Sequence, residues 1–262
     1  MGLDRRARRA LSLMGIERWT LRGGEGEALT DDAPARETAV APAPTPAPAP
    51  ASSPSPSLVA TSPAPATLPL ADTINVDAMD VDALRATVAG CQRCALHSTR
   101  THTVFGVGSL QADWMFVGEA PGAQEDRQGE PFVGRAGQLL NAMLAATGRE
   151  RQEVFIANVL KCRPPNNRDP SADEAAQCAP YLQRQIALIR PKVIIALGRI
   201  AAQRLLGVDT PLGRLRGRAH QWQTDSGPVP LVVTYHPAYL LRSPGEKRKA
   251  WEDLRLIMEL SA

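Results

Sequence analysis

The chain has 262 residues, of which 44% are hydrophobic, and its 30 Lys and Arg nearly balance 27 Asp and Glu. A formal net charge of +3 permits a nucleic acid partner without arguing for one, and four cysteines are too few for a disulfide scaffold. No apolar run approaches the ~20 residues that a membrane span needs, and the N-terminus lacks the apolar stretch of a signal peptide. We therefore expect a cytoplasmic protein with no membrane partner.

Two segments of unusual composition precede the part of the chain that can form a core. Residues 1–30 include a short amphipathic stretch, residues 5–21, in which leucines, Ile16 and Trp19 are interspersed with arginines. Residues 31–72 consist mostly of Ala, Pro, Ser and Thr, and such a segment cannot bury enough apolar surface to fold. We predict a short helical peptide over 1–30, a disordered linker over 31–72 and a folded domain over 73–262.

The folded domain alternates short apolar runs with amphipathic stretches. Apolar runs bounded by turn residues predict buried strands, and apolar residues at helical spacing predict helices. The predicted strands are 114–117, 154–160, 193–197 and 229–235, and the predicted helices are 76–88, 137–147, 173–190, 200–206 and 246–260. This alternation is typical of an α/β fold in which helices cover both faces of a mostly parallel sheet.

Polar residues that the apolar periodicity does not explain follow the predicted strands. Glu119 follows the first strand, Asn158 lies near the end of the second, Arg199 follows the third and His236 follows the fourth. In parallel sheets ligands bind beyond the carboxyl ends of the strands, so these side chains should meet at one edge. The pattern predicts a site there without naming its substrate.

Four cysteines are interleaved with these strands. Cys91 and Cys94 form a C-x2-C pair, whereas fifteen residues separate Cys162 from Cys178. Four thiolates suit either a tetrahedral zinc ion or a cubane iron–sulfur cluster, and the second pair could also be ordinary buried residues. The wide spacing of the second pair favours a cluster, because zinc sites usually combine two short-spaced pairs.

Five motifs in order make the domain recognisable: a C-x2-C pair, GEAPG, PFVGRAGQLL, NVLKCRPPNNR and HPAYLLR. Together they resemble the family 4 uracil-DNA glycosylases, the iron–sulfur branch of their superfamily, over roughly residues 75–262. The resemblance implies a monomer with a three-layer α/β/α fold around a central four-stranded parallel sheet. It also implies a [4Fe–4S] cluster bound by Cys91, Cys94, Cys162 and Cys178. The implied activity is monofunctional excision of uracil from single- or double-stranded DNA, which leaves an abasic site for base excision repair.

By the same resemblance, three residues would contact the flipped base. Phe132 would stack on uracil, although an isolated phenylalanine is more often an ordinary core residue. Asn158 would read the base, since its amide can donate to O4 and accept from N3–H, a pairing that cytosine reverses. His236 would donate to O2 as negative charge develops there, although a histidine at a strand end can also be purely structural.

The carboxylates match the superfamily only in part. Better-known branches have an aspartate directly after the position of Glu119 that orients the attacking water, and this chain has Ala120 there. We expect Glu119 and Ala120 beside the base, Glu125 as a candidate for holding the water or the loop, and Asn167 as an assisting residue. Glu125 and Asp126 could instead belong to a solvated loop surface.

The motif HPAYLLR resembles the loop that enters the space left by the flipped base. Leu240 or Leu241 is the expected wedge, and Arg242 an expected phosphate contact. Further phosphate contacts are expected from basic side chains near the site, which are Lys161, Arg163, Arg168 and the run 247–249. Such a basic run is equally typical of a solvated helix face.

Two other classes of function stay open. Because Ala120 replaces the aspartate, the protein could also be a non-catalytic module that binds nucleic acid and whose segments are joined by a bound metal group. A cluster alone would also suit an electron-transfer protein. Of these interpretations, base recognition is the one that explains both Asn158 and Phe132.

The N-terminal segment has a weak resemblance of its own. LSLMGIERWTLR, residues 11–22, is similar to the first helix-forming peptide of the psi subunit of the bacterial polymerase III clamp loader. This similarity predicts a replication protein, such as the clamp loader, as a partner of the tail. It also predicts a bacterial, nucleoid-associated location for the protein.

Overall fold

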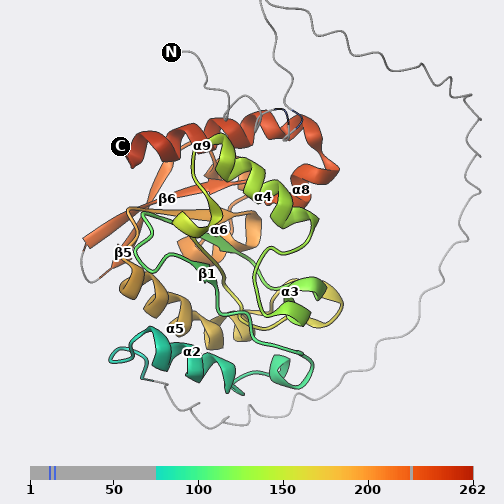
Figure 1. The fold of residues 1–262 in the computed structure, drawn as a ribbon, viewed down its shortest axis with the longest axis vertical. Coiled ribbons are helices and arrows are strands. Elements are labelled where there is room, and N and C mark those ends of the chain that lie inside the picture. Colours follow the sequence, from blue (N-terminus) through green and yellow to red (C-terminus); the bar gives the residue numbers. More distant parts are fainter. Residues whose placement is uncertain (1–11, 13–14, 16–74, 225–226, 262) are drawn as a thin grey trace, which may run out of the picture. The chain divides into compact units, whose positions relative to one another are not determined.

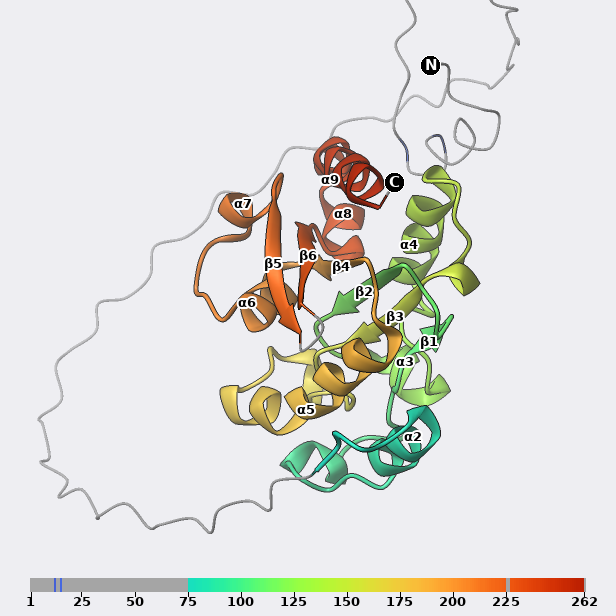
Figure 2. The same cartoon turned by 90° about the vertical axis from the view of Figure 1, so that its left-hand side faces the viewer.

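A six-stranded sheet lies at the centre of the structure, a computed structural model that describes Ser12, Gly15, residues 75–224 and residues 227–261. The strands follow the spatial order β1-β3-β2-β4-β6-β5; Figure 1 shows the fold, and Figure 2 labels all six strands. Their bounds are β1 Val107–Gly108, β2 Trp114–Gly118, β3 Phe155–Asn158, β4 Val193–Leu197, β5 Ala219–Thr224 and β6 Gly227–Thr234.

The four central strands are parallel, as the sequence predicts. β2 pairs in parallel with both β3 and β4, and β4 pairs in parallel with β6. The prediction of four strands is incomplete, because β1 and β5 add one antiparallel strand at each edge. β5 reads AHQWQT, in which exposed and half-buried residues alternate, so it lacks the continuous apolar run of a buried strand.

Helices cover both faces of the sheet and confirm the three-layer α/β/α prediction (Figure 2). α4, α8 and α9 pack on one face, whereas α5 and α6 pack on the other and α2 lies against α5. The α-helices are α2 Val81–Ala89, α3 Ala123–Gln128, α4 Arg135–Ala146, α5 Ala172–Ile189, α6 Arg199–Leu206, α7 Leu212–Leu215, α8 Pro237–Arg242 and α9 Lys247–Leu260. The short 3-10 helices are η1 Ala95–Ser98, η2 Arg151–Glu153, η3 Pro165–Asn167 and η4 Pro244–Glu246.

Side chains of each central strand alternate between two apolar cores. In β2, Trp114 and Phe116 join the core with α4 and α9, whereas Met115 and Val117 join the core with α5 and α6. Successive side chains of a strand point to opposite faces, and both faces of this sheet are covered. A buried parallel strand therefore appears in the sequence as an unbroken apolar run.

Two helix starts fix the loops at the carboxyl edge of the sheet. Ser171 caps α5 through a reciprocal capping box with Glu174, which ends the loop that follows β3. His236 is the N-cap of α8, and Pro237 occupies the first helical position, where its missing N–H costs nothing. His236 is thus held between the end of β6 and the start of a helix.

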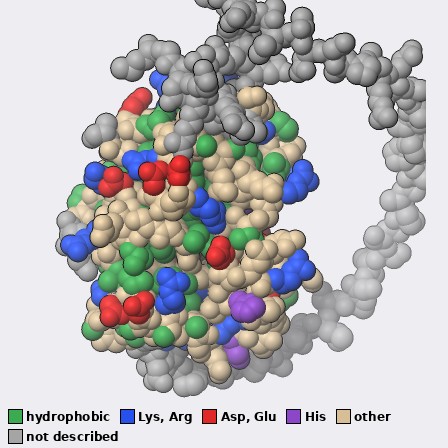
Figure 3. All heavy atoms as spheres, in the orientation of Figure 1, with side chains coloured by type: hydrophobic (Ala, Val, Ile, Leu, Met, Phe, Trp, Pro, Cys, Tyr) green, Lys and Arg blue, Asp and Glu red, His purple; other side chains and the backbone are tan. Residues whose placement is uncertain are grey.

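The predicted helical peptide over 1–30 and the predicted linker over 31–72 lie outside the described residues, apart from Ser12 and Gly15. Within the described part of the chain, no helix is long and apolar enough to cross a membrane. On the face shown in Figure 3, the described basic and acidic side chains are interspersed rather than gathered by sign. The described residues on this face therefore form no broad basic surface.

Candidate active site

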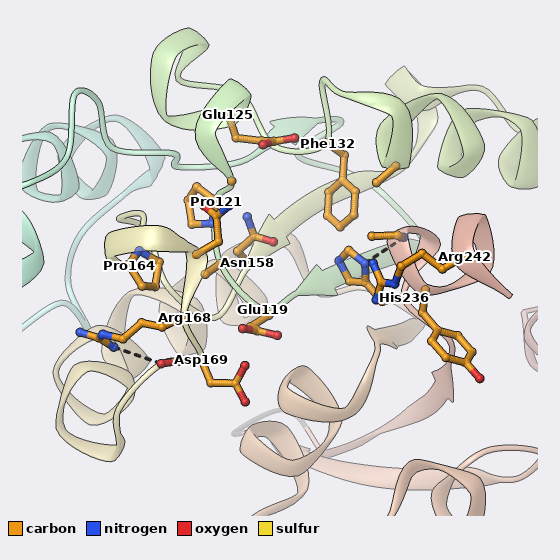
Figure 4. Close-up of a pocket in the computed structure, with 16 residues that line it drawn as sticks. Glu119, Pro121, Glu125, Phe132, Asn158, Pro164, Arg168, Asp169, His236 and Arg242 are labelled. Carbon is orange, nitrogen blue, oxygen red and sulfur yellow. Dashed lines mark hydrogen bonds between the residues drawn. The ribbon is translucent and has the colours of Figure 1, made fainter. Parts of the chain in front are cut away.

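A pocket of about 490 Å³ opens at the carboxyl edge of the parallel strands (Figure 4). It is lined by the end of β3, by the segments that follow β2, β3 and β6, by α3, by the start of α4 and by α8. The residues that the sequence places near the base and the water all line it: Glu119, Ala120, Glu125, Phe132, Asn158, Asn167 and His236. Its volume suits a small organic ligand.

Phe132 lines the pocket from a backbone conformation that phenylalanine rarely adopts. Its φ is +54°, in the left-handed region, which costs of order 1–3 kcal/mol for such a residue. The first turn of α4 makes room for this backbone, since a Cβ on Gly137 would lie 1.7 Å from the Phe132 carbonyl oxygen. Phe132 also packs in the core with α4 and α9, as the alternative of a core phenylalanine expects, whereas strain held in place in this way is typical of a functional position.

Asn158 ends β3 with a buried side chain that is not fully bonded. The residue is 2% exposed, and its Oδ1 has no hydrogen-bond partner among the described residues. The space for the amide comes from Gly118, its partner in register on β2, where a Cβ would lie 2.3 Å from Oδ1. An unpaired buried acceptor costs about 1–3 kcal/mol, so this oxygen is suited to a donor on a ligand.

His236 lies beside Phe132, with ring centroids 5.5 Å apart and planes inclined by 30°. The Ala238 amide donates a hydrogen bond to His236 Nδ1 over 3.1 Å, so Nε2 carries the proton of the neutral ring. Burial, with a smaller contribution from Arg242, lowers the pKa of His236 to about 4. The ring is therefore neutral near pH 7 and offers one N–H donor.

Glu119 has an unusual proton affinity for a carboxyl group. Burial raises the pKa of Glu119 to about 7, and the charge of Asp169 adds to this shift while Arg199 opposes it. Asp169 and Arg199 form an ion pair of 2.9 Å, and Glu119 lies between Asn158 and Asp169 in the view of Figure 4. Near neutral pH, Glu119 can therefore either hold or release a proton.

Glu125 and Asn167 tie the loops at the rim of the pocket. Glu125 Oε1 accepts a hydrogen bond from the Val133 amide over 3.2 Å, which joins α3 to the segment that carries Phe132. Asn167 Oδ1 accepts from Arg163 Nε over 2.7 Å, and Asn167 has a left-handed φ of +53°. The predicted phosphate contact Arg163 is thus engaged in holding a loop residue of the pocket.

Asp126 is not part of a solvated loop surface, so that alternative is wrong for this residue. It is 3% exposed, and its Oδ1 accepts from the Thr101 amide over 2.9 Å and from the His102 amide over 3.4 Å. Asp126 therefore anchors the segment after η1 to α3, the helix that contributes Glu125 to the pocket.

Lys161 does not reach the surface, so its predicted phosphate contact is wrong. The residue is 1% exposed, and Nζ donates to the Asn158 carbonyl oxygen over 2.8 Å and to Gln185 Oε1 over 2.6 Å. Burial lowers the pKa of Lys161 to about 8. The turn after β3 directs the side chain inward, and no lysine lines the pocket among the described residues.

The two adjacent leucines of HPAYLLR have opposite environments. Leu240 is 0% exposed and packs in the core with α4 and α9, so the prediction of Leu240 as a DNA wedge is wrong. Leu241 is 36% exposed and keeps that prediction, while Arg242 lines the pocket. Helical geometry explains the difference, because neighbouring residues of α8 point in different directions.

Other basic residues near the site are paired within the protein. Two guanidinium nitrogens of Arg168 donate to Glu174 over 2.8 and 2.5 Å, and these bonds lower the pKa of Glu174 to about 2. In the run 247–249, Lys249 pairs with Glu246 and Arg248 with Glu252. These ion pairs fit the alternative of a solvated helix face.

The four cysteines come together from distant parts of the sequence. They line one small cavity between the end of α2, the turn after β3 and α5. Within the described residues, no group of three or more His, Cys, Asp or Glu is placed to hold a single metal ion. The shared cavity brings the two cysteine pairs together, as a bound group with four cysteine ligands requires.

The surroundings of the sulfurs suit thiolates that are bound to a group rather than free. Burial raises the pKa of Cys94 and Cys162, and raises that of Cys178 to about 12. Arg100 Nη1 donates to Cys162 Sγ over 3.1 Å, and the Lys161 amide donates to Cys178 Sγ over 3.3 Å. A bound metal group would supply the positive charge that keeps the buried thiols ionised, and the N–H donors fit such thiolates.

The pocket also contains residues that the motifs do not single out. Asp169, Tyr239 and Pro164 line it, and the ring of Tyr239 stacks on Tyr235 with centroids 5.1 Å apart. Tyr239 lies within HPAYLLR, so an exposed aromatic beside the expected wedge was a usable signal. Asp169 carries no such signal, because its place beside Glu119 depends on how the loop before α5 folds.

The sequence matches known proteins over the same part of the chain. Residues 105–255 match the family model of the uracil DNA glycosylase superfamily. A type-4 uracil-DNA glycosylase of Archaeoglobus fulgidus is 45% identical over 184 residues, which are 69% of this chain and 92% of that protein. A type-4 uracil-DNA glycosylase of Thermotoga maritima is 45% identical over 170 residues, or 64% and 87% of the two chains.

A more distant relative belongs to another branch. A type-5 uracil-DNA glycosylase of Pyrobaculum aerophilum is 30% identical over 151 residues, which are 51% of this chain and 64% of that protein. The higher identity and wider coverage of the type-4 enzymes agree with the motifs of the sequence. This chain belongs to the uracil DNA glycosylase superfamily, and within it to the type-4 uracil-DNA glycosylases.

Proposed function

We propose that this chain excises uracil from DNA by hydrolysing the N-glycosidic bond, and that it leaves an abasic site for base excision repair. The observation that carries the proposal is the unpaired, buried Oδ1 of Asn158 in a pocket that also contains Phe132 and His236. Such a pocket suits a planar base that has left the DNA stack. The similar enzymes are named for the same activity.

Base selection is assigned to Asn158 and Phe132. Asn158 Oδ1 accepts from uracil N3–H and its NH2 group donates to O4, whereas cytosine presents an acceptor and a donor in the reverse order. A cytosine would therefore leave buried polar groups unpaired, which is the strongest form of discrimination that a site can build. Phe132 stacks on the ring and needs its fixed backbone to do so.

Departure of the base is assigned to His236. Cleavage of the N-glycosidic bond leaves negative charge on uracil O2, and a donor aimed at that oxygen stabilises the transition state. The neutral ring with a proton on Nε2 provides such a donor without placing a proton on the product.

Water activation is assigned to Glu119, with Glu125 and Asn167 holding the surrounding loops. Ala120 stands where other branches have an aspartate, and the half-buried carboxyl of Glu119, directly after β2, lines the same pocket as Asn158. The enzyme is monofunctional in this proposal, because no lysine among the described pocket residues can form a Schiff base.

DNA is contacted by the exposed part of α8 in this proposal. Leu241 enters the space left by the base, Arg242 contacts a phosphate, and the exposed ring of Tyr239 lies beside them. Arg168 also lines the pocket, and Arg163 is bonded to the pocket residue Asn167, so both are proposed as further phosphate contacts.

The cofactor of this proposal is a [4Fe–4S] cluster held by Cys91, Cys94, Cys162 and Cys178. Their shared cavity and the N–H donors to sulfur support a bound metal group, and the similarity to the type-4 enzymes favours the cluster over zinc. The cluster would join the C-x2-C segment to the turn after β3 and so stabilise the side of the domain behind Asn158. Iron and sulfide should be present in equal amounts, and each Cys→Ser change should remove both together with the visible absorption.

The activity is tested with a labelled oligonucleotide that carries one uracil, and a thymine oligonucleotide serves as control. The protein should release the base from the first substrate alone, and strand cleavage should appear only after alkali. Asn158→Asp should lose discrimination between uracil and cytosine, whereas Asn141→Asp, an exposed change on α4, should leave it intact. Intact iron-loaded protein that releases no uracil would favour the non-catalytic nucleic acid-binding module, whose supporting feature is Ala120.

The partner of the N-terminal peptide is a separate proposal. We propose that residues 11–22 bind a clamp-loader or other replication protein, on the basis of their similarity to the psi subunit. The full-length protein should retain clamp-loader proteins in a pull-down, and Trp19→Ala should abolish retention without changing uracil release. If the wild-type protein retained no more clamp-loader protein than the Trp19→Ala variant, the proposal would be contradicted.

A further inference from the structure

A buried polar chain lies behind Asn158 and has no role in the assignments above. Lys161 Nζ donates to the Asn158 main-chain oxygen over 2.8 Å and to Gln185 Oε1 over 2.6 Å. Gln185 is 1% exposed on α5, and its Nε2 donates to the Phe105 main-chain oxygen over 2.8 Å. These hydrogen bonds therefore link the end of β3 to α5 and to the segment before β1.

The two groups bonded to the Gln185 side chain each have a single hydrogen-bonding role. A lysine side chain here can only donate and a main-chain carbonyl can only accept, so the two neighbours of Gln185 fix the orientation of its amide. Two N–H groups of Lys161 Nζ donate to two acceptors, the Asn158 main-chain oxygen and Gln185 Oε1. A buried network with satisfied members is rigid, and breaking one contact leaves a costly unpaired group.

The network completes the support of the main chain at the end of β3. On one side, the Val159 and Leu160 amides donate to the Gly118 and Glu119 oxygens over 2.9 and 3.0 Å. On the other, Lys161 holds the carbonyl of Asn158 itself. With its main chain fixed from both sides, Asn158 extends its amide into the narrow space that Gly118 leaves open.

We propose that Lys161, backed by Gln185, is a positioning residue that holds Asn158 in the orientation required to select uracil. The proposal rests on the base-reading role proposed for Asn158. Displacement of a reacting or recognising group by about 1 Å can cost ~10²-fold in rate, so a contact behind Asn158 can decide the specificity of the pocket without touching the base.

The test is a double-mutant cycle between Lys161→Met and Asn158→Ala, measured by single-turnover uracil release from single-stranded DNA. Lys161→Met keeps the length of the side chain and removes its donors. It should lower the maximal single-turnover rate on the order of 10-fold or more and leave the half-saturating enzyme concentration unchanged, while the iron content stays that of the wild type. In the Asn158→Ala background the same change should cost less than about 3-fold.

Equal losses in both backgrounds would overturn the proposal, because Lys161 would then act on stability or on DNA binding instead of through Asn158. If Asn158→Ala releases uracil as fast as the wild type, the base-reading role itself fails, and this outcome is distinct from additivity. Should Lys161→Met not load iron, Gln185→Leu decides the question, since it removes one acceptor of Nζ from a different element. Its control is Gln183→Leu on the exposed side of α5, which should leave uracil release unchanged.

Discussion

The main-chain amide of Ala238 donates a hydrogen bond to Nδ1 of His236 over 3.1 Å, and this contact determines which ring nitrogen carries the proton. Because Nδ1 is the acceptor, the neutral ring is protonated on Nε2. Burial lowers the pKa of His236 from its ordinary value of 6.5 to about 4. The same geometry that makes His236 the N-cap of α8 thus supplies a neutral donor to the pocket.

The contribution of His236 to uracil release should not change between pH 8 and pH 5. His236→Gln should lower the rate of base release by ~10²–10³-fold, as expected for the loss of one donor to developing negative charge. Because the pKa is lowered, the active neutral form persists down to pH 5 and is lost only near pH 4. The measurement is the ratio of wild-type to variant single-turnover rates across this range, and a ratio that falls by half near pH 6.5 would contradict a neutral, buried ring.

Glu119 should destabilise the protein at alkaline pH. Its folded pKa of about 7 lies above the ordinary 4.5, so the folded state binds the proton more tightly than the unfolded state. The stability contributed by the protonated form is fully present below pH 4.5 and is lost as the pH rises through 7. Glu119→Gln should therefore raise Tm relative to wild type at pH 8.5 and lose this advantage at pH 4.5.

The control for that comparison is Glu259→Gln, an exposed change on α9. Both variants lose one carboxylate, so a general effect of net charge would appear in both. Thermal unfolding curves at the two pH values separate the cases. A Glu119→Gln advantage of the same size at both pH values would contradict a raised pKa.

Much of the fold could be predicted because buried parallel strands leave an unbroken apolar pattern. Residues 193–197 were predicted as a strand and form β4 with the same bounds, and the predicted helix over 173–190 corresponds to α5. The edge strands could not be predicted in the same way. β5 has one half-covered face and polar residues, and β1 is two residues long, so neither carries an apolar run.

The pocket residues could be predicted because strand ends and loop motifs are local in sequence. The direction of a side chain depends on the fold and not on the local sequence. The two wrong predictions of DNA contacts, Lys161 and Leu240, follow from this. Lys161 is three residues from Asn158 yet points into the interior, and Leu240 differs from Leu241 only in its position around α8. Asp169 affects Glu119 from a loop fifty residues away in the chain, a contact that only the folded structure brings about.

Gly118 should not tolerate replacement by alanine without loss of activity. A Cβ at this position would lie 2.3 Å from Asn158 Oδ1 and 2.9 Å from the Phe132 ring, so Gly118→Ala displaces both proposed base contacts at once. We expect a loss of uracil release of more than ~10²-fold together with a lower Tm. Gly213→Ala in α7 is the matched control, because nothing lies within 4 Å of its Cβ position, and it should retain both properties. Full activity of Gly118→Ala would mean that Asn158 and Phe132 do not act from these positions.

The two leucines of α8 should separate stability from DNA insertion. Leu240→Ala creates a cavity in the core with α4 and α9 and should lower the free energy of unfolding by about 2–5 kcal/mol. Leu241→Ala removes an exposed side chain and should change stability by less than ~0.5 kcal/mol.

Only the exposed leucine should distinguish duplex from single-stranded substrate. A wedge replaces the flipped base in the stack, and unstacking a paired base costs a few kcal/mol more than releasing an unpaired one. Leu241→Ala should therefore slow uracil release from duplex DNA by ~10-fold or more and from single strands far less. Leu240→Ala, assayed well below its Tm and corrected for the folded fraction, should slow both substrates by the same factor. The ratio of duplex to single-strand rates is the decisive quantity, because a loss of stability cancels from it. An unchanged ratio in Leu241→Ala would assign insertion to another exposed residue of α8, for which Tyr239 is the next variant to measure.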